Sequence, residues 1–149
     1  MNNRIVIAVD GSENSRRAVA YVVRLLGGRS GFAVMLLHVI HAPDEDFFSS
    51  PREREKWLKS GRKKVEKWLA DYRNMLIADG FGSGDVSVHI AERDGPSLAR
   101  LILTEMKSLE AGTLVVGRQG LSRKEEFLFG SVSKQIVSYA RQCTVWVVQ

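Results

Sequence analysis

The sequence has few of the residues that stabilise secreted proteins or build metal centres. It contains a single cysteine, Cys143, so no disulfide can form within the chain and a secreted, bridged scaffold is not expected. We expect Cys143 to be a small buried hydrophobic residue, since neither sequence neighbour is a basic residue or a histidine that would lower its pKa. The three histidines, His38, His41 and His89, are scattered along the chain, and we expect no metal site built from them.

Long apolar runs and targeting signals are also missing. No run approaches the roughly 20 apolar residues that are needed to cross a bilayer. The first four residues lead directly into a strand-like segment, without the pattern of a signal peptide. We therefore expect a cytoplasmic protein that makes no contact with a membrane.

Recognised catalytic motifs are missing as well. The chain has no Gly-x4-Gly-Lys-[Ser/Thr] P-loop and no Gly-x-Ser-x-Gly nucleophile elbow. No side chain stands out as a general base, so we expect no catalytic residue and no fast turnover. Slow hydrolysis of a bound nucleotide needs no dedicated base and stays compatible with the sequence.

What the sequence does have is a regular alternation of strand-like and helix-like segments. Five apolar runs predict strands that are buried on both faces, at residues 4–9, 32–40, 86–90, 113–116 and 144–148. Apolar residues at three- and four-residue intervals predict four helices: after Ser12, over 52–79, after Ser97 and over 130–141. We predict a single domain over residues 1–149 with a three-layer α/β fold, in which an open parallel sheet of about five strands carries helices on both faces.

Two expectations concern packing on the first two helices. The first helix has an apolar stripe that includes Leu25 and Leu26, and we expect both to face the core. On the helix at 52–79, Trp57 and Trp68 are eleven residues apart and share one face, which favours core packing over an exposed partner surface.

The most specific pattern is Gly117-x2-Gly120-x9-Gly130-Ser131, which directly follows the strand at 113–116. A second strand, at 4–9, ends in Asp10-Gly11-Ser12. The carboxyl ends of parallel strands meet at one edge of the sheet, where ligands bind. The two segments therefore predict a phosphate or nucleotide pocket at that edge.

Each residue type in this pattern suits a nucleotide. Glycine lets the backbone approach a ligand closely, so we expect Gly117→Val to lose the nucleotide and keep the fold. The first amides of the helix at 130–141 and the hydroxyls of Ser131 and Ser133 are donors for phosphate oxygens. Asp10 can accept from ribose hydroxyls or help to hold a divalent ion carried by the phosphates. A backbone group near Val39 can read the adenine edge.

Six segments together carry a resemblance to a known family: 5–12, 36–40, 95–96, 115–120, 129–133 and 143–148. Over essentially the whole chain they are similar to the universal stress proteins. The resemblance implies a Rossmann-like fold of the adenine nucleotide α-hydrolase type. Because the glycine motif is intact, it also implies the ATP-binding branch of the family, with Mg²⁺ or Mn²⁺ bound through the phosphates.

The resemblance also implies site residues and partners. The adenosine side is expected to hold Ala8, Asp10 and Val39, and the ribose and phosphate side Val116, Gly117, Gln119, Gly120, Gly130, Ser131, Val132 and Ser133. Many members have His or Arg at the position of Gln119, which leaves the contacts to the γ-phosphate open. The last strand, 144–148, is expected at a sheet edge and in a homodimer interface. We expect a regulatory protein of the stress response that is non-catalytic or hydrolyses ATP very slowly, and whose nucleotide state alters contacts with an unidentified partner.

The net charge of +5 comes from one segment. Residues 51–74 hold nine basic and four acidic residues, so the rest of the chain sums to zero. A solvated helix face is the favoured interpretation, and nucleic acid is not expected because few aromatic residues stand among the basic ones. Two alternatives stay open. One is a slow ATP-hydrolysing or nucleotidyl-transfer enzyme using Asp10, Ser131 and Ser133, and the other is a nucleic-acid-binding module built on the basic helix at 52–73.

Overall fold

The computed structural model of the protein describes residues 2–95, 97–118 and 131–149. The five strands are β1 (Arg4–Ala8), β2 (Ala33–His41), β3 (Val86–Arg93), β4 (Thr113–Gly117) and β5 (Thr144–Val148). They form a parallel sheet in the order β3-β2-β1-β4-β5. The predicted parallel sheet of five strands is therefore confirmed, and so is the position of β5 at an edge.

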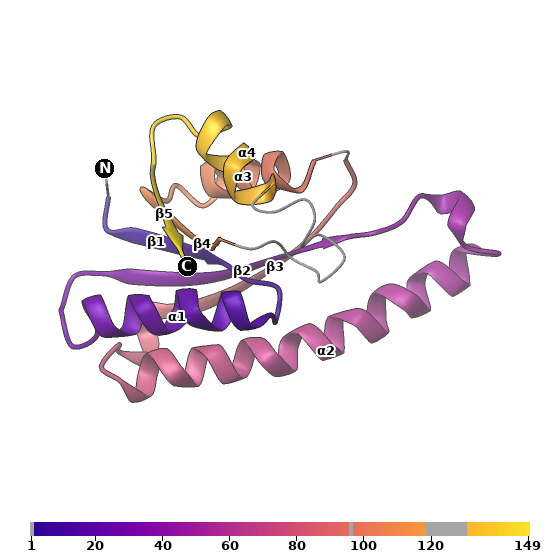
Figure 1. Ribbon diagram of the computed structural model, residues 1–149. Helices are drawn as coiled ribbons and strands as arrows, with labels where there is room; N and C mark the ends of the chain where they lie inside the picture. The colour runs from indigo at the N-terminus through magenta and orange to yellow at the C-terminus, as the bar shows by residue number, and fades with distance from the viewer. Residues whose placement is uncertain (1, 96, 119–130) are drawn as a thin grey trace.

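The helices cover both faces of this sheet (Figure 1). Helices α1 (Glu13–Leu26) and α2 (Pro51–Ala78) pack on one face, and α3 (Leu98–Ser108) and α4 (Ser131–Tyr139) pack on the other. Two short 3-10 helices, η1 (Glu45–Phe47) and η2 (Ser83–Asp85), precede α2 and β3. These three layers confirm the predicted α/β architecture.

Alternation along β1 builds the two halves of the core. Ile5 and Ile7 face the cluster under α1 and α2, whereas Val6 and Ala8 face the cluster under α3 and α4. Because successive side chains of a strand point to opposite faces, a strand covered on both sides reads as a continuous apolar run. This packing is the reason that the strands could be found in the sequence.

Serine side chains begin three of the helices. The hydroxyl oxygens of Ser12, Ser50 and Ser97 accept from the backbone N–H groups of Ser15, Glu53 and Arg100. Each hydroxyl pairs one of the donors that the first turn of a helix leaves unpaired. The cap at Ser12 matters most here, because it fixes the turn that directly follows β1.

Several boundaries differ from those predicted. Strand β3 runs to Arg93 rather than residue 90, because its alternating, half-exposed end reads less clearly as a strand than a fully buried one. Helix α4 ends at Tyr139, and the positive φ of Gln142, 61°, turns the chain toward β5. The prediction for Leu25 was wrong: its side chain is 42% exposed, while Leu26 is buried.

Helix α2 extends beyond the sheet. Its buried residues, Val65, Leu69, Tyr72 and Leu76, all lie in the second half of the helix. The first half and η1 form an arm that projects past the ends of β2 and β3 (Figure 1). We call residues 43–62 the arm. Among the helices of the described residues, none is long and apolar enough to cross a membrane.

Candidate functional site

The carboxyl ends of β1 and β4 lie side by side at the centre of the sheet. Val6 and Ile7 of β1 are in register with Leu114 and Val115 of β4. The chain leaves β1 toward α1 on one face, and the next described helix after β4, α4, lies on the opposite face. A crevice of this kind, where connections diverge to opposite faces, is where open α/β sheets bind ligands.

Asp10 is a charged residue at this edge, and one of its carboxylate oxygens is fixed. Oδ1 accepts from the backbone N–H of Ser12 at 2.9 Å and from the hydroxyl of Ser15 at 2.6 Å. The backbone N–H of Asp10 in turn donates to Ser15 Oγ at 2.9 Å. These bonds hold the carboxylate against the first turn of α1.

The other carboxylate oxygen of Asp10, Oδ2, is buried and has no hydrogen-bond partner among the described residues. A buried, unpaired oxygen of a charged group costs free energy, because it has lost its water without gaining a donor. The Asp10 site therefore fits a ligand that brings a hydroxyl donor or a cation to Oδ2.

The loop after β1 rests on α2. Gly11 has a φ of +82°, and a Cβ at this position would lie 3.1 Å from the Trp68 ring. The Tyr72 hydroxyl donates to the backbone carbonyl of Ser12 at 3.3 Å. Burial, together with the nearby charge of Asp10, raises the pKa of Tyr72 to about 12, so this hydroxyl keeps its proton. Helix α2 thus supports the Asp10 loop from the α1 face.

His38 of β2 also supports the loop after β1. Its Nδ1 lies 2.7 Å from the backbone carbonyl oxygen of Val9, so Nδ1 carries the proton and donates it. The ring packs edge-on against Trp68, with centroids 5.0 Å apart. Burial lowers the pKa of His38, an effect that the Val9 carbonyl and the charge of Asp10 oppose.

Gly117, at the end of β4, is in close contact with α1 rather than with the crevice. A Cβ on Gly117 would lie 2.9 Å from both Asn14 Cβ and the Asn14 backbone oxygen. The physical reason given for Gly117→Val is therefore corrected: the added bulk falls on the backbone of α1. Gly117 is needed for the close approach of β4 to this helix.

The structure places the hydroxyl proton of Ser133 away from the crevice. Ser133 is buried, and its hydroxyl donates to the backbone carbonyl of Arg118 at 3.1 Å. The N–H of Arg118 donates to the carbonyl of Val148 at 2.7 Å, which ties this turn to β5. In this arrangement Ser133 ties α4 to the turn after β4.

The remaining predicted residues fall into three groups. The side chains of Ala8, Val39 and Val116 are buried in the core under α3 and α4, and Val132 packs against that core, so only their backbones are available at the edge. Of Ser131 the structure describes only the backbone, at the start of α4. Gln119, Gly120 and Gly130 lie outside the described residues.

Two basic residues line an open hollow of about 510 Å³ beside the end of β4. They are Arg118, which follows β4, and Lys134 of α4. Val137 of α4 and Val147 of β5 form its apolar wall. Cations beside the first turn of a helix favour an anionic group there.

Sequence reasoning missed Ser15 and the support from Trp68 and Tyr72. Ser15 is the third residue after the α1 cap, and it is 3% exposed although it is polar. A serine at that spacing after Asp10 was the available signal for a residue that fixes the carboxylate. The contact of Trp68 with the loop has no local signal, because the two are more than fifty residues apart in the sequence.

Comparisons with known proteins show the family to which similar chains belong. A family model described as the universal stress protein family matches residues 1–149. The universal stress protein Sll1388 of Synechocystis sp. is 24% identical over 157 residues, which cover 98% of this chain and 97% of that protein.

Two solved structures share the fold and contain nucleotides. A universal stress protein in complex with cAMP has a TM-score of 0.68 and 19% identity, covering 99% of this chain and 96% of that chain. The universal stress protein of Archaeoglobus fulgidus in complex with dAMP has a TM-score of 0.67 and 17% identity, covering 98% of this chain and 97% of that chain.

Proposed function

Because this chain belongs to the universal stress protein family, we propose that it binds an adenine nucleotide at the carboxyl edge of β1 and β4. Two proteins of the same fold were solved with cAMP and with dAMP, which supports an adenine nucleotide as the ligand class. The crevice between the two strands is also where a Rossmann-like sheet favours such a ligand.

The observation that carries the proposal is the buried, unpaired Oδ2 of Asp10. A ribose offers hydroxyl donors, and a hydrogen bond to a charged acceptor is worth more than one between neutral groups. Since Ser12 and Ser15 already hold Oδ1, the carboxylate is positioned before the ligand arrives. A pre-positioned acceptor loses little conformational entropy on binding.

We assign ATP as the nucleotide. The support comes from the glycine motif in the sequence, from the α4 N-terminus and from Arg118 and Lys134 beside it. Backbone amides at Ser131 to Ser133 would pair phosphate oxygens, and the two cations would balance their charge. A Mg²⁺ or Mn²⁺ ion would enter bound to the phosphate oxygens, which are hard ligands of the kind that these cations prefer.

The protein holds the nucleotide as a regulator of the stress response rather than as an enzyme with fast turnover. Of the titratable side chains at this edge, Asp10 is fixed by Ser12 and Ser15, and His38 is fixed by Val9 and Trp68. Nucleotide release would alter the loop that Trp68 and Tyr72 of α2 support, which offers a route to a partner protein.

A homodimer through β5 completes the proposal. Strand β5 is an edge of the sheet, and Val147 on it is 39% exposed. An exposed apolar edge strand favours pairing with a second chain. The carbonyl of Val148 also accepts from Arg118, so an interface at β5 would adjoin the nucleotide site.

Native mass spectrometry of freshly purified protein, followed by denaturation, tests the proposal. We expect the native mass to include an adenine nucleotide, and the denatured sample to release it in chromatography. If nothing is released and added ATP with Mg²⁺ gives no calorimetric signal, the proposed ligand class is wrong. If bound ATP is hydrolysed with fast turnover at saturating ATP, the protein is an enzyme instead.

A further inference from the structure

The solvent face of α2 carries a continuous row of five cations. Their spacing along the helix is four, three, four and four residues, and all five side chains are exposed: Arg52, Lys56, Lys59, Lys63 and Lys67. None of the five forms an ion pair with another described residue. We call this set the basic ridge.

The ridge is narrow, and acidic residues border it but do not lie within it. At 3.6 residues per turn the five residues fall within an arc of about 80°, and with a rise of 1.5 Å per residue they extend over about 22 Å. The acidic residues of α2 fall outside that arc, and two of them are held elsewhere: Glu53 by Ser49, and Glu66 by Arg62. The ridge therefore presents a strip of five cations to solvent, with Glu55 and Glu66 along one border.

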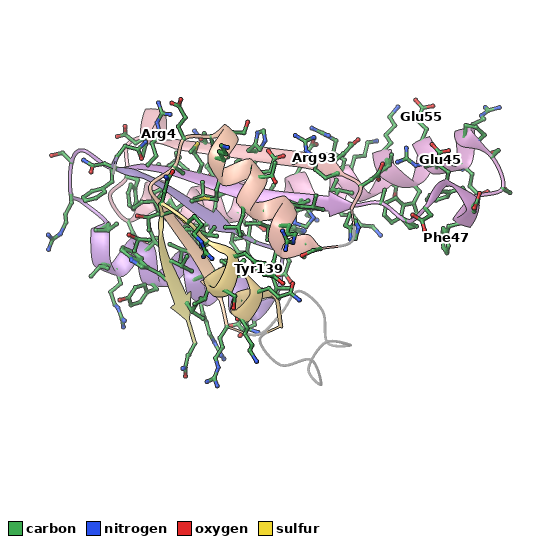
Figure 2. All side chains as sticks on the ribbon, turned by 90° about the horizontal axis from the view of Figure 1, so that it is seen from above. Arg4, Glu45, Phe47, Glu55, Arg93 and Tyr139 are labelled. Carbon is green, nitrogen blue, oxygen red and sulfur yellow. The ribbon has the colours of Figure 1, made fainter. Side chains whose placement is uncertain are left out.

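Exposed aromatic rings stand at the end of the same helix. Phe47 of η1 is 71% exposed and Trp57 is 41% exposed, and both pack against the ring of Phe48. Figure 2 shows Phe47 and Glu45 at the tip of the arm, far from Arg4 and Tyr139 on the body of the molecule. The prediction that Trp57 packs in the core was wrong. At 3.6 residues per turn Trp57 lies about 80° outside the arc of the ridge, so the exposed rings flank the basic residues at the end of the arm.

We propose that the basic ridge and the rings at its end bind single-stranded nucleic acid. A strip of cations tracks a phosphate backbone, and exposed aromatic rings stack on bases that are not already stacked in a duplex. An anionic membrane fits less well, because the buried apolar residues of α2 all lie in its second half and are packed on the sheet, which leaves only Phe47 and Trp57 among the described large apolar side chains of the arm to insert into lipid. An acidic peptide would use the cations but would leave the rings without a stacking partner.

The first test is binding of a fluorescein-labelled single-stranded oligonucleotide of 20 residues, oligo(dU) or oligo(U), measured by fluorescence anisotropy. We expect binding at low salt that weakens as salt is added. A plot of the logarithm of the binding constant against the logarithm of the salt concentration should have a slope of roughly −0.7 for each phosphate contacted, or about −3.5 for five contacts. Tighter binding of the ribose oligonucleotide would identify RNA as the ligand, and tighter binding of the deoxyribose oligonucleotide would identify DNA. No binding at low salt would overturn the proposal.

A matched pair of charge-reversal variants distinguishes the effect of the ridge cations from the effect of the overall net charge. Lys59→Glu/Lys63→Glu removes two ridge contacts, so we expect affinity at least about 10-fold lower and a slope shallower by roughly 1.4. Arg29→Glu/Lys107→Glu makes the same change in net charge at exposed sites away from the ridge, and we expect little loss. Equal losses in the two variants would show that only the overall charge matters, and would overturn the proposal.

Stacking is tested separately at Phe47. Because its side chain is mostly exposed, Phe47→Ala leaves the fold intact, and we expect affinity for the single strand to fall at least about 5-fold with the salt slope unchanged. Equal affinity of the unaltered protein for a duplex of the same length would contradict the assignment to single strands. Tighter binding to phosphatidylserine vesicles than to the oligonucleotide would show that the ridge serves a membrane instead.

Discussion

Asp10 shows how a few hydrogen bonds position a carboxylate. Ser12 and Ser15 fix one carboxylate oxygen, while the other stays buried without a partner among the described residues. The sequence predicted Asp10 as a pocket residue because it follows a strand. It could not predict that one carboxylate oxygen is hydrogen-bonded and the other is not, since this depends on the three-dimensional turn at the start of α1.

Gly117→Ala tests the contact between β4 and α1. The new Cβ would lie 2.9 Å from the Asn14 backbone oxygen, and backbone cannot rotate away as a side chain can. We expect the free energy of unfolding to fall by about 1–3 kcal/mol, measured by urea denaturation.

The matched control for Gly117 is Gly61→Ala, inside α2. Nothing lies within 4 Å of a Cβ at position 61, and alanine is the better helix former. We expect this variant to gain roughly 0.5–1 kcal/mol. If Gly117→Ala were as stable as the unaltered protein, the close approach of β4 to α1 would be contradicted.

His38 gives the fold a dependence on pH. Burial lowers its pKa from 6.5, so protonation favours the unfolded chain. The stability that neutral His38 contributes is present above pH 6.5 and is lost as the pH falls through the lower pKa of the folded state.

The measurement is the melting temperature between pH 8 and pH 5, compared with His38→Gln. Glutamine can still donate to the Val9 carbonyl but does not titrate, so we expect a smaller fall of the melting temperature on acidification. Parallel curves for the two proteins would mean that His38 has the same pKa in the folded and unfolded states and has no part in the pH dependence.

At the scale of elements, α2 divides into two halves with different environments. Val65, Leu69, Tyr72 and Leu76 anchor the second half to the sheet, whereas the first half is held mainly by exposed ion pairs such as Arg62–Glu92. Exposed ion pairs contribute little stability. The arm is therefore the part of the helix that opens most easily.

Amide hydrogen exchange tests this division. We expect the amides of residues 54–62 to exchange faster than those of residues 65–76, because local opening is less costly where few apolar contacts are buried. Leu69→Ala should speed exchange in the second half, since Leu69 is 1% exposed in the core. Equal protection along the whole helix would contradict the division.

Periodicity predicted that α2 is a helix but not where it leaves the sheet. Trp57 and Trp68 share one face, and the pattern treats them alike. Trp68 is packed against the core and His38, whereas Trp57 lies beyond the sheet against Phe48. The difference arises because β2 and β3 do not extend beneath the first half of α2 (Figure 1). A helical pattern carries no information about how far the sheet beneath the helix extends.

At the scale of the whole molecule, the parallel sheet and the edge position of β5 followed from the sequence. Continuous apolar runs alternating with helices specify a parallel sheet, because both of its faces must be covered. The arm did not follow from the sequence. Its position depends on how the turn through η1 and the ion pair between Arg54 and Asp94 set α2 against β3.

The proposed dimer is tested by matched substitutions at the two edges of the sheet. Val147 on β5 and Val88 on β3 are 39% and 40% exposed. We expect Val147→Lys to give a monomer in sedimentation velocity, because a charge at an edge strand blocks pairing, and Val88→Lys to leave the dimer intact. The opposite result would move the interface to β3.

The central claim is that Asp10 Oδ2 receives an adenine nucleotide, and titration calorimetry with ATP and Mg²⁺ tests it most directly. Asp10→Asn keeps the oxygen that Ser12 and Ser15 hold and replaces only the unpaired one with a donor. We predict affinity at least about 10-fold weaker than that of the unaltered protein, since a hydrogen bond to a charged group is worth about 1.5–3 kcal/mol. Asp44→Asn, at an exposed position on the arm, should bind ATP normally. Undiminished affinity in Asp10→Asn would contradict the account.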